Sequence, residues 1–129
     1  MAGGSKADAP HLPSPAPIDA YGNGGFRFAS MSHRGSLLCL PDGIWAWPVK
    51  HVTELSEAEL EPVFTRAQAL DFFLIGAGRD PWAMPEQLRA RFRELSLSVD
   101  AMATGPAVRT YNILLAEGRR VGAGLIAVE

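Results

Sequence analysis

The chain has 129 residues, a formal net charge of −2 and 47% hydrophobic residues, which is the balance of one ordinary globular domain. This charge argues against a dedicated nucleic-acid-binding protein, and no apolar run reaches the roughly 20 residues that a membrane span requires. The single cysteine, Cys39, excludes a disulfide framework within the chain and any metal site built from several cysteines.

Residues 1–17 differ in composition from the rest, with four prolines, two glycines and few large apolar side chains. Such a segment has little to bury, so we predict a disordered or extended tail followed by one domain over residues 18–129. The tail lacks the hydrophobic stretch of a secretory signal, and it lacks the arginines of a mitochondrial presequence because the first arginine is Arg27. The sequence therefore favours a cytoplasmic protein.

Residues 18–47 carry β patterns. The run Tyr-Gly-Asn-Gly-Gly at 21–25 is a turn signal, and in Phe26-Arg27-Phe28 the rings share one face, the two-residue period of a half-buried strand. Residues 36–47 predict a β-hairpin around Pro-Asp-Gly, with both tryptophans of its second strand on one face.

The rest of the chain alternates helices with strands. Ser56 and Glu59 form a capping box for a helix in which Pro62 marks either a kink or a restart. Residues 71–76 form the clearest buried strand. The later elements are a helix from Pro85 to about residue 95, a strand at 97–101, a helix capped by Thr104 and ended by Gly118, and a strand at 120–128.

This order of elements fixes the fold class. A strand–helix–strand–helix–strand succession demands a parallel or mixed sheet with helices covering it. We predict an α/β fold: a three-layer single domain with a central mixed β-sheet, helices covering it and an additional antiparallel β part from the N-terminal half.

The strongest local motif follows the buried strand, at residues 76–80. Gly76 and Gly78 leave backbone amides open to an anion, and Arg79 adds a cationic fork. The motif lacks the third glycine of a dinucleotide fingerprint and the Gly-Lys-Ser/Thr of a phosphate loop. In the alternative interpretation the glycines only turn the chain, and Arg79 pairs with Asp80 or a neighbouring carboxylate.

The start of the next helix is expected beside this motif. In open α/β sheets ligands settle outside the carboxyl ends of the strands, so free amides at Thr104 would face the same crevice. Arg109 and Asn112 lie together on one edge of that helix, where they either bind a ligand or partner or tie the helix to a loop. The candidate ligand-binding residues are Gly76, Gly78, Arg79, Thr104, Arg109 and Asn112.

The sequence shows no catalytic or metal-ligating set, and we expect no cofactor. His11, His33 and His51 lack the spacing of metal ligands, and His33 is expected in a loop. Cys39 on its strand is expected to be a buried inert thiol, although a Cys–His dyad with His33 stays open. Trp82, in a connection, is the candidate partner contact, the alternative being an ordinary scattered surface ring.

Three motifs stand in a familiar order: YGNGGFRF at 21–28, LIGAG at 74–78, and a longer pattern from Met102 to Arg119 that includes AVRTYN at 107–112. In these the chain resembles the Mth-like small α/β domain family over roughly residues 18–128. The resemblance implies a three-layer fold with a central mixed sheet. It also implies similarity to the mitochondrial assembly factor 3 of respiratory complex I and to an adipogenesis-associated animal protein.

The expected function joins the two lines of reasoning. We expect a cytoplasmic, non-enzymatic binding module with a protein partner, without nucleic-acid binding or membrane insertion, which assists assembly of respiratory complex I or another membrane complex. The alternative is a binder of a small anionic ligand, or an enzyme, that uses the crevice between the 76–80 loop and the 104–112 helix start.

Overall fold

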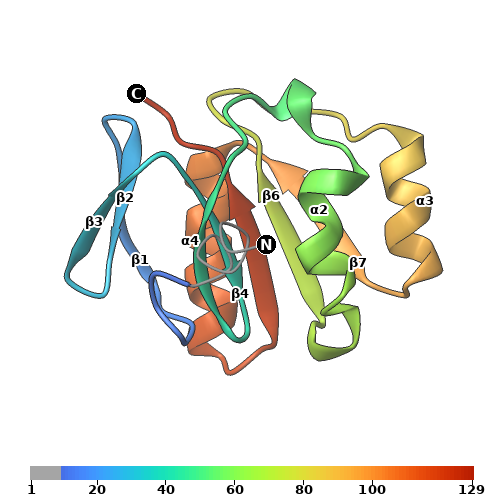
Figure 1. The fold of residues 1–129 in the computed structure, drawn as a ribbon, viewed down its shortest axis with the longest axis horizontal. Helices are drawn as coiled ribbons and strands as arrows, with labels where there is room; N and C mark the ends of the chain where they lie inside the picture. The colour runs from blue at the N-terminus through green and yellow to red at the C-terminus, as the bar shows by residue number, and fades with distance from the viewer. Residues whose placement is uncertain (1–9) are drawn as a thin grey trace, which may run out of the picture.

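A five-stranded sheet forms the centre of the structure, a computed structural model in which residues 10–129 are described (Figure 1). Its strands are β4 (Ser36–Leu40), β5 (Gly43–Trp47), β6 (Phe72–Gly76), β7 (Ser98–Met102) and β8 (Val121–Leu125). They lie in the order β5-β4-β8-β6-β7. β6 is parallel to β7 and β8, whereas β4 is antiparallel to β5 and β8, which confirms the predicted mixed sheet.

Helices cover both faces of this sheet. Because alternate side chains of a strand point to opposite faces, Phe73 packs with α2 (Glu57–Phe64) and α3 (Glu86–Glu94), and Leu74 packs with α4 (Thr104–Ala116). Two short 3-10 turns, η1 (Val52–Glu54) and η2 (Ala67–Ala69), flank α2. The predicted helix-covered sheet is therefore confirmed.

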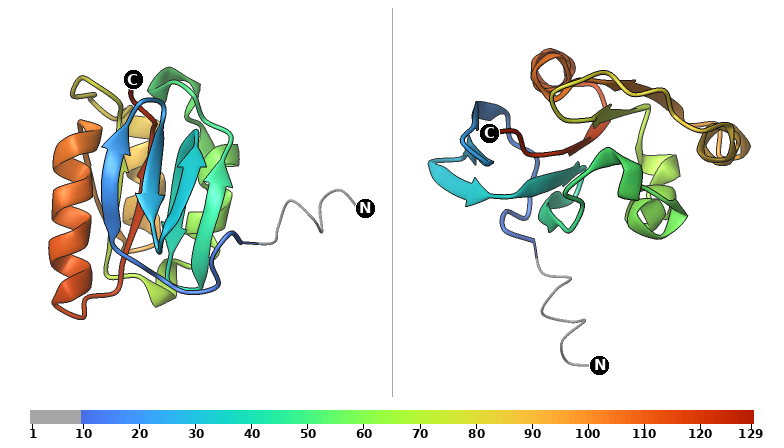
Figure 2. Two further views of the ribbon diagram at one scale, coloured as in Figure 1. Left: turned by 90° about the vertical axis from the view of Figure 1, so that its left-hand side faces the viewer. Right: turned by 90° about the horizontal axis from the view of Figure 1, so that it is seen from above.

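A second, three-stranded sheet lies beside α4 on the same face (Figure 2, left). Its strands β1 (Ile18–Gly22), β2 (Gly25–Phe28) and β3 (Met31–Arg34) are all antiparallel. This confirms the additional antiparallel part. The prediction of a loop at His33 was wrong, because His33 pairs with Phe26 of β2. β3 lacks an apolar run, so pairing rather than burial makes it a strand.

The first residues of α2 and α4 can be compared with the capping residues that the sequence predicts. The capping box of Ser56 and Glu59 is present, and α2 runs continuously to Phe64 with Pro62 inside it, so the helix does not restart there. Thr104 was predicted as the cap of α4, but the N-cap is Ala103 and Thr104 is the first helical residue. The Thr104 hydroxyl forms its hydrogen bonds with residues outside α4.

The predicted tail lies only partly within the described residues; residues 1–9 fall outside them. In the described part, the His11 N–H donates to the Ile44 carbonyl at 2.8 Å, and the Ile44 N–H donates to the Leu12 carbonyl at 2.9 Å. These bonds hold the segment against the outer edge of β5, so ordered backbone begins before Ile18. Within residues 10–129 no helix has the length and apolarity to cross a membrane.

Candidate functional site

The two loops of the predicted crevice meet, because β6 and β7 are neighbours, but they meet in direct contact. The Thr104 N–H donates to the Gly78 carbonyl at 2.8 Å, and the Gly78 N–H donates to Thr104 Oγ1 at 2.9 Å. A Cβ on Gly76 would lie 3.1 Å from Thr104 Cα and 3.2 Å from Ala107 Cβ. The N–H groups of Gly78 and Thr104, which were expected to face a ligand, therefore each donate to an oxygen of the other residue.

Thr104 is a buried junction between three elements. Its side chain has no exposed surface, and its Oγ1 donates to the Ile126 carbonyl at 2.7 Å while it accepts from Gly78. The hydroxyl thus joins the loop after β6, the first turn of α4 and the exit of β8. Sequence patterns do not show this role, because both partners are distant in the chain.

The other two candidates on α4 have different surroundings. Asn112 Oδ1 accepts from the Ile18 N–H at 2.8 Å and Asn112 Nδ2 donates to the Ile18 carbonyl at 2.8 Å, so its amide ties α4 to strand β1. Arg109 is exposed. The Tyr21 hydroxyl lies where a Cβ on Gly105 would point, so it covers the first turn of α4.

A cleft of about 790 Å³ lies on the other side of the 76–80 loop. β5, β6 and β8 run in the same direction, so the segments after them (48–53, 77–82 and 126–129) converge at one edge of the sheet (Figure 1). Gly24, residues 34–36 and Trp47 complete the lining. The cleft lies at carboxyl ends of strands, where ligands of α/β sheets settle.

Ser36 braces two of these walls. Its buried Oγ donates to the Val49 carbonyl at 2.6 Å and accepts from the Ala127 N–H at 3.0 Å. Glu54 Oε1 in turn accepts the backbone N–H groups of Lys50 at 2.9 Å and His51 at 3.2 Å. These two bonds hold the pKa of the Glu54 carboxyl below its usual value and fix the 48–53 segment.

Two tryptophans form the apolar side of the cleft. Trp47 is buried, and its Nε1 donates to the Glu59 carbonyl at 3.1 Å. Gly124 makes room for it, since a Cβ there would lie 2.6 Å from Trp47 Cη2. Trp82, the predicted partner contact, packs against the core and remains partly exposed in the lining.

Three cationic side chains from different segments of the chain line the cleft: Arg34, Lys50 and Arg79. The described residues form five ion pairs, and none includes a residue of the cleft. Arg79 therefore makes no ion pair with Asp80 or any other described carboxylate. Asp80 and Glu129 are the acids of the lining, and Glu129 approaches Arg34 at Gly24 without pairing with it.

The thiol lies away from this chemistry. Cys39 is fully buried, and burial raises its pKa to about 12, so it stays protonated and unreactive, as predicted. His33 Nε2 lies 3.2 Å from the Ser36 carbonyl, and burial lowers the pKa of the His33 ring. Nowhere in residues 10–129 do three or more His, Cys, Asp or Glu side chains gather in a way that could hold a metal.

The structure thus defines a three-layer α/β domain with a cleft at the carboxyl ends of the strands of its mixed sheet. The family model described as "Protein of unknown function (DUF498/DUF598)" matches residues 18–126. The chain belongs to this family.

Relatives and solved structures agree with this assignment. An uncharacterized protein of Rhodobacter capsulatus is 37% identical over 85% of this chain and 83% of its own length. The mouse NADH dehydrogenase [ubiquinone] 1 alpha subcomplex assembly factor 3 is 25% identical over 89% of this chain, which spans only 62% of that protein.

Two solved structures show the same fold. A crystal structure reported as an outer membrane protein from Bartonella henselae has a TM-score of 0.89 and 48% identity, covering 92% of this chain and 100% of that one. A Bordetella pertussis protein described as a Mth938-like domain has a TM-score of 0.76 and 25% identity, covering 86% and 85%. The predicted Mth-like resemblance is confirmed.

Proposed function

We propose that this chain is a non-enzymatic binding module that assists assembly of a respiratory NADH dehydrogenase by holding a segment of a protein partner in the cleft. The observation that carries the proposal is the similarity to assembly factor 3 proteins from mouse and human over 89% and 84% of this chain. The chain spans about three fifths of those proteins, so the shared part is the domain with the cleft.

The lining of the cleft supports binding as its task. Trp82 offers a partly exposed ring, the kind of side chain that dominates protein contacts, and the unpaired cations offer charge-assisted hydrogen bonds. Cys39 does not belong to this lining, because its side chain packs against α4. We also propose that the protein works in the cytoplasm, without nucleic acid and without inserting into a membrane.

The test is deletion of the gene in the organism that encodes this chain. Assembled NADH dehydrogenase is then measured by native gel electrophoresis and by NADH oxidation in isolated membranes. We expect less assembled enzyme, restored by the wild-type chain. A normal amount of assembled enzyme in the deletion strain contradicts the proposal.

A second candidate function is the binding of a small anionic ligand. Because Gly76, Gly78 and Thr104 close the predicted crevice, the cations favour the neighbouring cleft as its site. A ligand that binds the folded state raises the melting temperature by mass action. Thermal unfolding with phosphate, succinate and citrate tests this candidate, and an unchanged melting temperature with all three contradicts it.

A further inference from the structure

The cations of the cleft define the chemistry of its occupant. We infer that the cleft binds a short acidic segment of a protein partner, whose carboxylates pair with Arg34, Lys50 and Arg79 while an apolar side chain packs against Trp82. The inference rests on the proposed function and names what the partner presents.

Charge complementarity is the first argument. Arg66, Arg91, Arg93 and Arg120 of this chain form ion pairs within the described residues. The three cations of the cleft form none, as is also true of Arg27, Arg89, Arg109 and Arg119. What distinguishes Arg34, Lys50 and Arg79 is that they share one cleft, whose acids are Asp80 and Glu129, so cations outnumber acids in the lining. Arginine binds a carboxylate through two parallel N–H donors, so the two arginines suit carboxylate partners in particular.

The position of the cations is the second argument. Arg34 ends β3, Lys50 lies in the segment after β5, and Arg79 lies in the segment after β6, so they approach the cleft from three walls. A single phosphate or acetate ion fills only a small part of about 790 Å³. Several carboxylates on one extended segment satisfy separate cations together.

The aromatic wall is the third argument. Trp82 packs against the core on one side and remains partly exposed in the cleft on the other. Pro81 beside it restricts the backbone, and apolar Val52 and Ile126 also line the space. A purely charged occupant leaves this apolar surface in water, whereas an apolar side chain between carboxylates covers it.

The probes are three blocked peptides: Glu-Leu-Asp-Leu-Glu, its basic counterpart Lys-Leu-Lys-Leu-Lys, and Glu-Gly-Asp-Gly-Glu. Fluorescence anisotropy of labelled peptides with the full chain measures the Kd. We expect binding of the first peptide only, at least about tenfold tighter than the glycine peptide because leucine burial is lost there. Equal binding of the acidic and basic peptides, or no binding of any peptide, overturns the inference.

Variants of the protein locate the site. Arg79→Glu, exposed in its loop, is expected to weaken the acidic peptide about tenfold or more, as is Lys50→Glu. Arg119→Glu is the matched control, because it makes the same change of charge at an exposed arginine that lies before β8, at the end of that strand away from the cleft. Unchanged melting temperatures show that each variant folds. Peptide affinity that is the same in Arg79→Glu and the wild type overturns the inference.

Competition binding experiments and the gene deletion distinguish the remaining possibilities. Free glutamate, succinate or phosphate that displaces the peptide at concentrations near the peptide's own Kd overturns the inference in favour of a small anion. If the gene deletion lowers assembled NADH dehydrogenase but no acidic peptide binds, the proposed function stands and this inference falls. If the peptide binds at Arg79 but the deletion leaves the enzyme intact, the acidic-segment site stands and the assembly role falls.

Discussion

Two buried hydroxyls shape one wall of the cleft. Thr104 Oγ1 donates to the carbonyl of Ile126, and Ser36 Oγ accepts from the N–H of the next residue, Ala127. Each hydroxyl also has a second partner, Gly78 or Val49, on another segment. A buried hydroxyl is stable only when it is hydrogen-bonded, so both residues fix the path of the chain after β8.

Thr104→Val tests this junction. Valine keeps the shape but leaves the Gly78 N–H and the Ile126 carbonyl buried without a partner, which we expect to lower the free energy of unfolding by about 2–4 kcal/mol. Urea denaturation measures it. Thr110→Val on the same helix is the control, because the Thr110 hydroxyl lies only against the Met102 sulfur at 4.0 Å. Equal losses in the two variants contradict the assigned role.

Gly124→Ala tests whether the packing of the Trp47 ring requires a glycine at position 124. The new methyl group would lie 2.6 and 2.7 Å from ring atoms of Trp47, so we expect a loss of about 1–3 kcal/mol in unfolding free energy. In a Trp47→Phe background the colliding ring atoms are absent, and the same substitution should cost much less. An equal cost in both backgrounds, measured by denaturant unfolding, shows that Trp47 is not the constraint.

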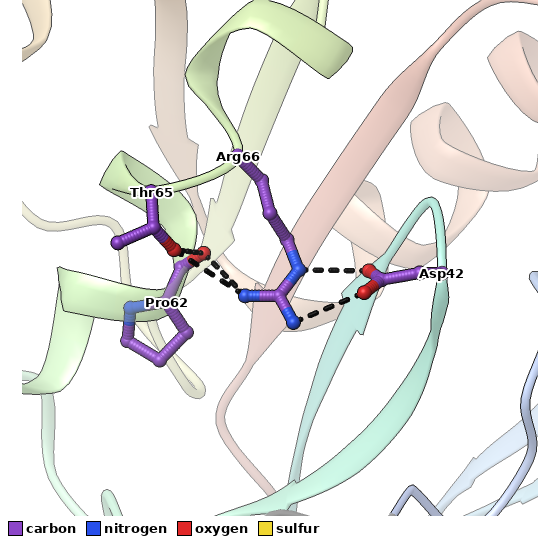
Figure 3. A network of polar contacts seen from close by, with 4 residues as sticks. All are labelled: Asp42, Pro62, Thr65 and Arg66. Carbon is purple, nitrogen blue, oxygen red and sulfur yellow. Dashed lines mark hydrogen bonds and ion pairs between the residues drawn. The ribbon is translucent and has the colours of Figure 1, made fainter.

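At the scale of elements, a surface network joins the β4–β5 turn to the end of α2 (Figure 3). Arg66 Nε and Nη2 donate to the two carboxylate oxygens of Asp42 at 2.7 and 3.1 Å, and Nη1 donates to the Pro62 carbonyl at 2.9 Å. The guanidinium also lies 5.0 Å from the ring centre of Trp45. The Arg66 side chain thus links the β4–β5 turn to the last turn of α2.

A double-mutant cycle of Asp42→Asn and Arg66→Gln measures this link. Because the Asp42 side chain is 57% exposed, we expect a coupling of only about 0.5–1 kcal/mol at neutral pH. The hydrogen bonds from Arg66 lower the pKa of Asp42, so the coupling is present above the unfolded carboxyl's pKa and declines as pH falls from about 5 towards about 3. Coupling that is unchanged over this range contradicts an ionic link.

Sequence reasoning succeeded where the signal was local. The hairpin of β4 and β5, the capping box at Ser56 and the end of α4 before Gly118 all depend on nearby residues, and all are present. It failed at β3, which has no burial pattern of its own, and at the cap of α4, because the partners of Thr104 are 22 and 26 residues away.

The cleft could not be predicted from the sequence, for a related reason. The motif at 76–80 does lie at the carboxyl edge of the sheet, as predicted, and Arg79 and Trp82 both line the cleft. The convergence of Arg34 and Lys50 with them follows from the order β5-β4-β8-β6-β7, in which β8 separates β4 from β6. No local pattern specifies that order.

At the scale of the whole molecule, the three-stranded sheet is an outer layer that α4 holds in place. The Asn112 side chain binds both backbone polar groups of Ile18, and the Tyr21 hydroxyl sits over Gly105. Phe26 and Phe28 of β2 pack into the core that α4 shares with the central sheet. The motifs at 21–28 and 102–119 therefore meet in space.

Asn112→Ala should loosen this layer selectively. The Ile18 N–H and carbonyl lose their partners, at a cost of about 1–3 kcal/mol, and we expect amides of β1 and β2 to exchange with deuterium about tenfold faster. Amides of β6, an interior strand of the five-stranded sheet, should keep their rates. Gln87→Ala on α3 is the control, because Gln87 is exposed. Uniformly faster exchange in all strands contradicts a separate outer layer.

The bridge between Leu12 and Ile44 has a practical consequence. The family match spans residues 18–126, yet Leu12 shields the outer edge of β5, and Val128 accepts a hydrogen bond from the Gly24 N–H at 2.8 Å beside the cleft. A recombinant fragment trimmed to the matched span exposes a bare strand edge, the usual template for aggregation. It also loses residues 127–129, which line the cleft, so a ligand screen on such a fragment would test an incomplete cleft.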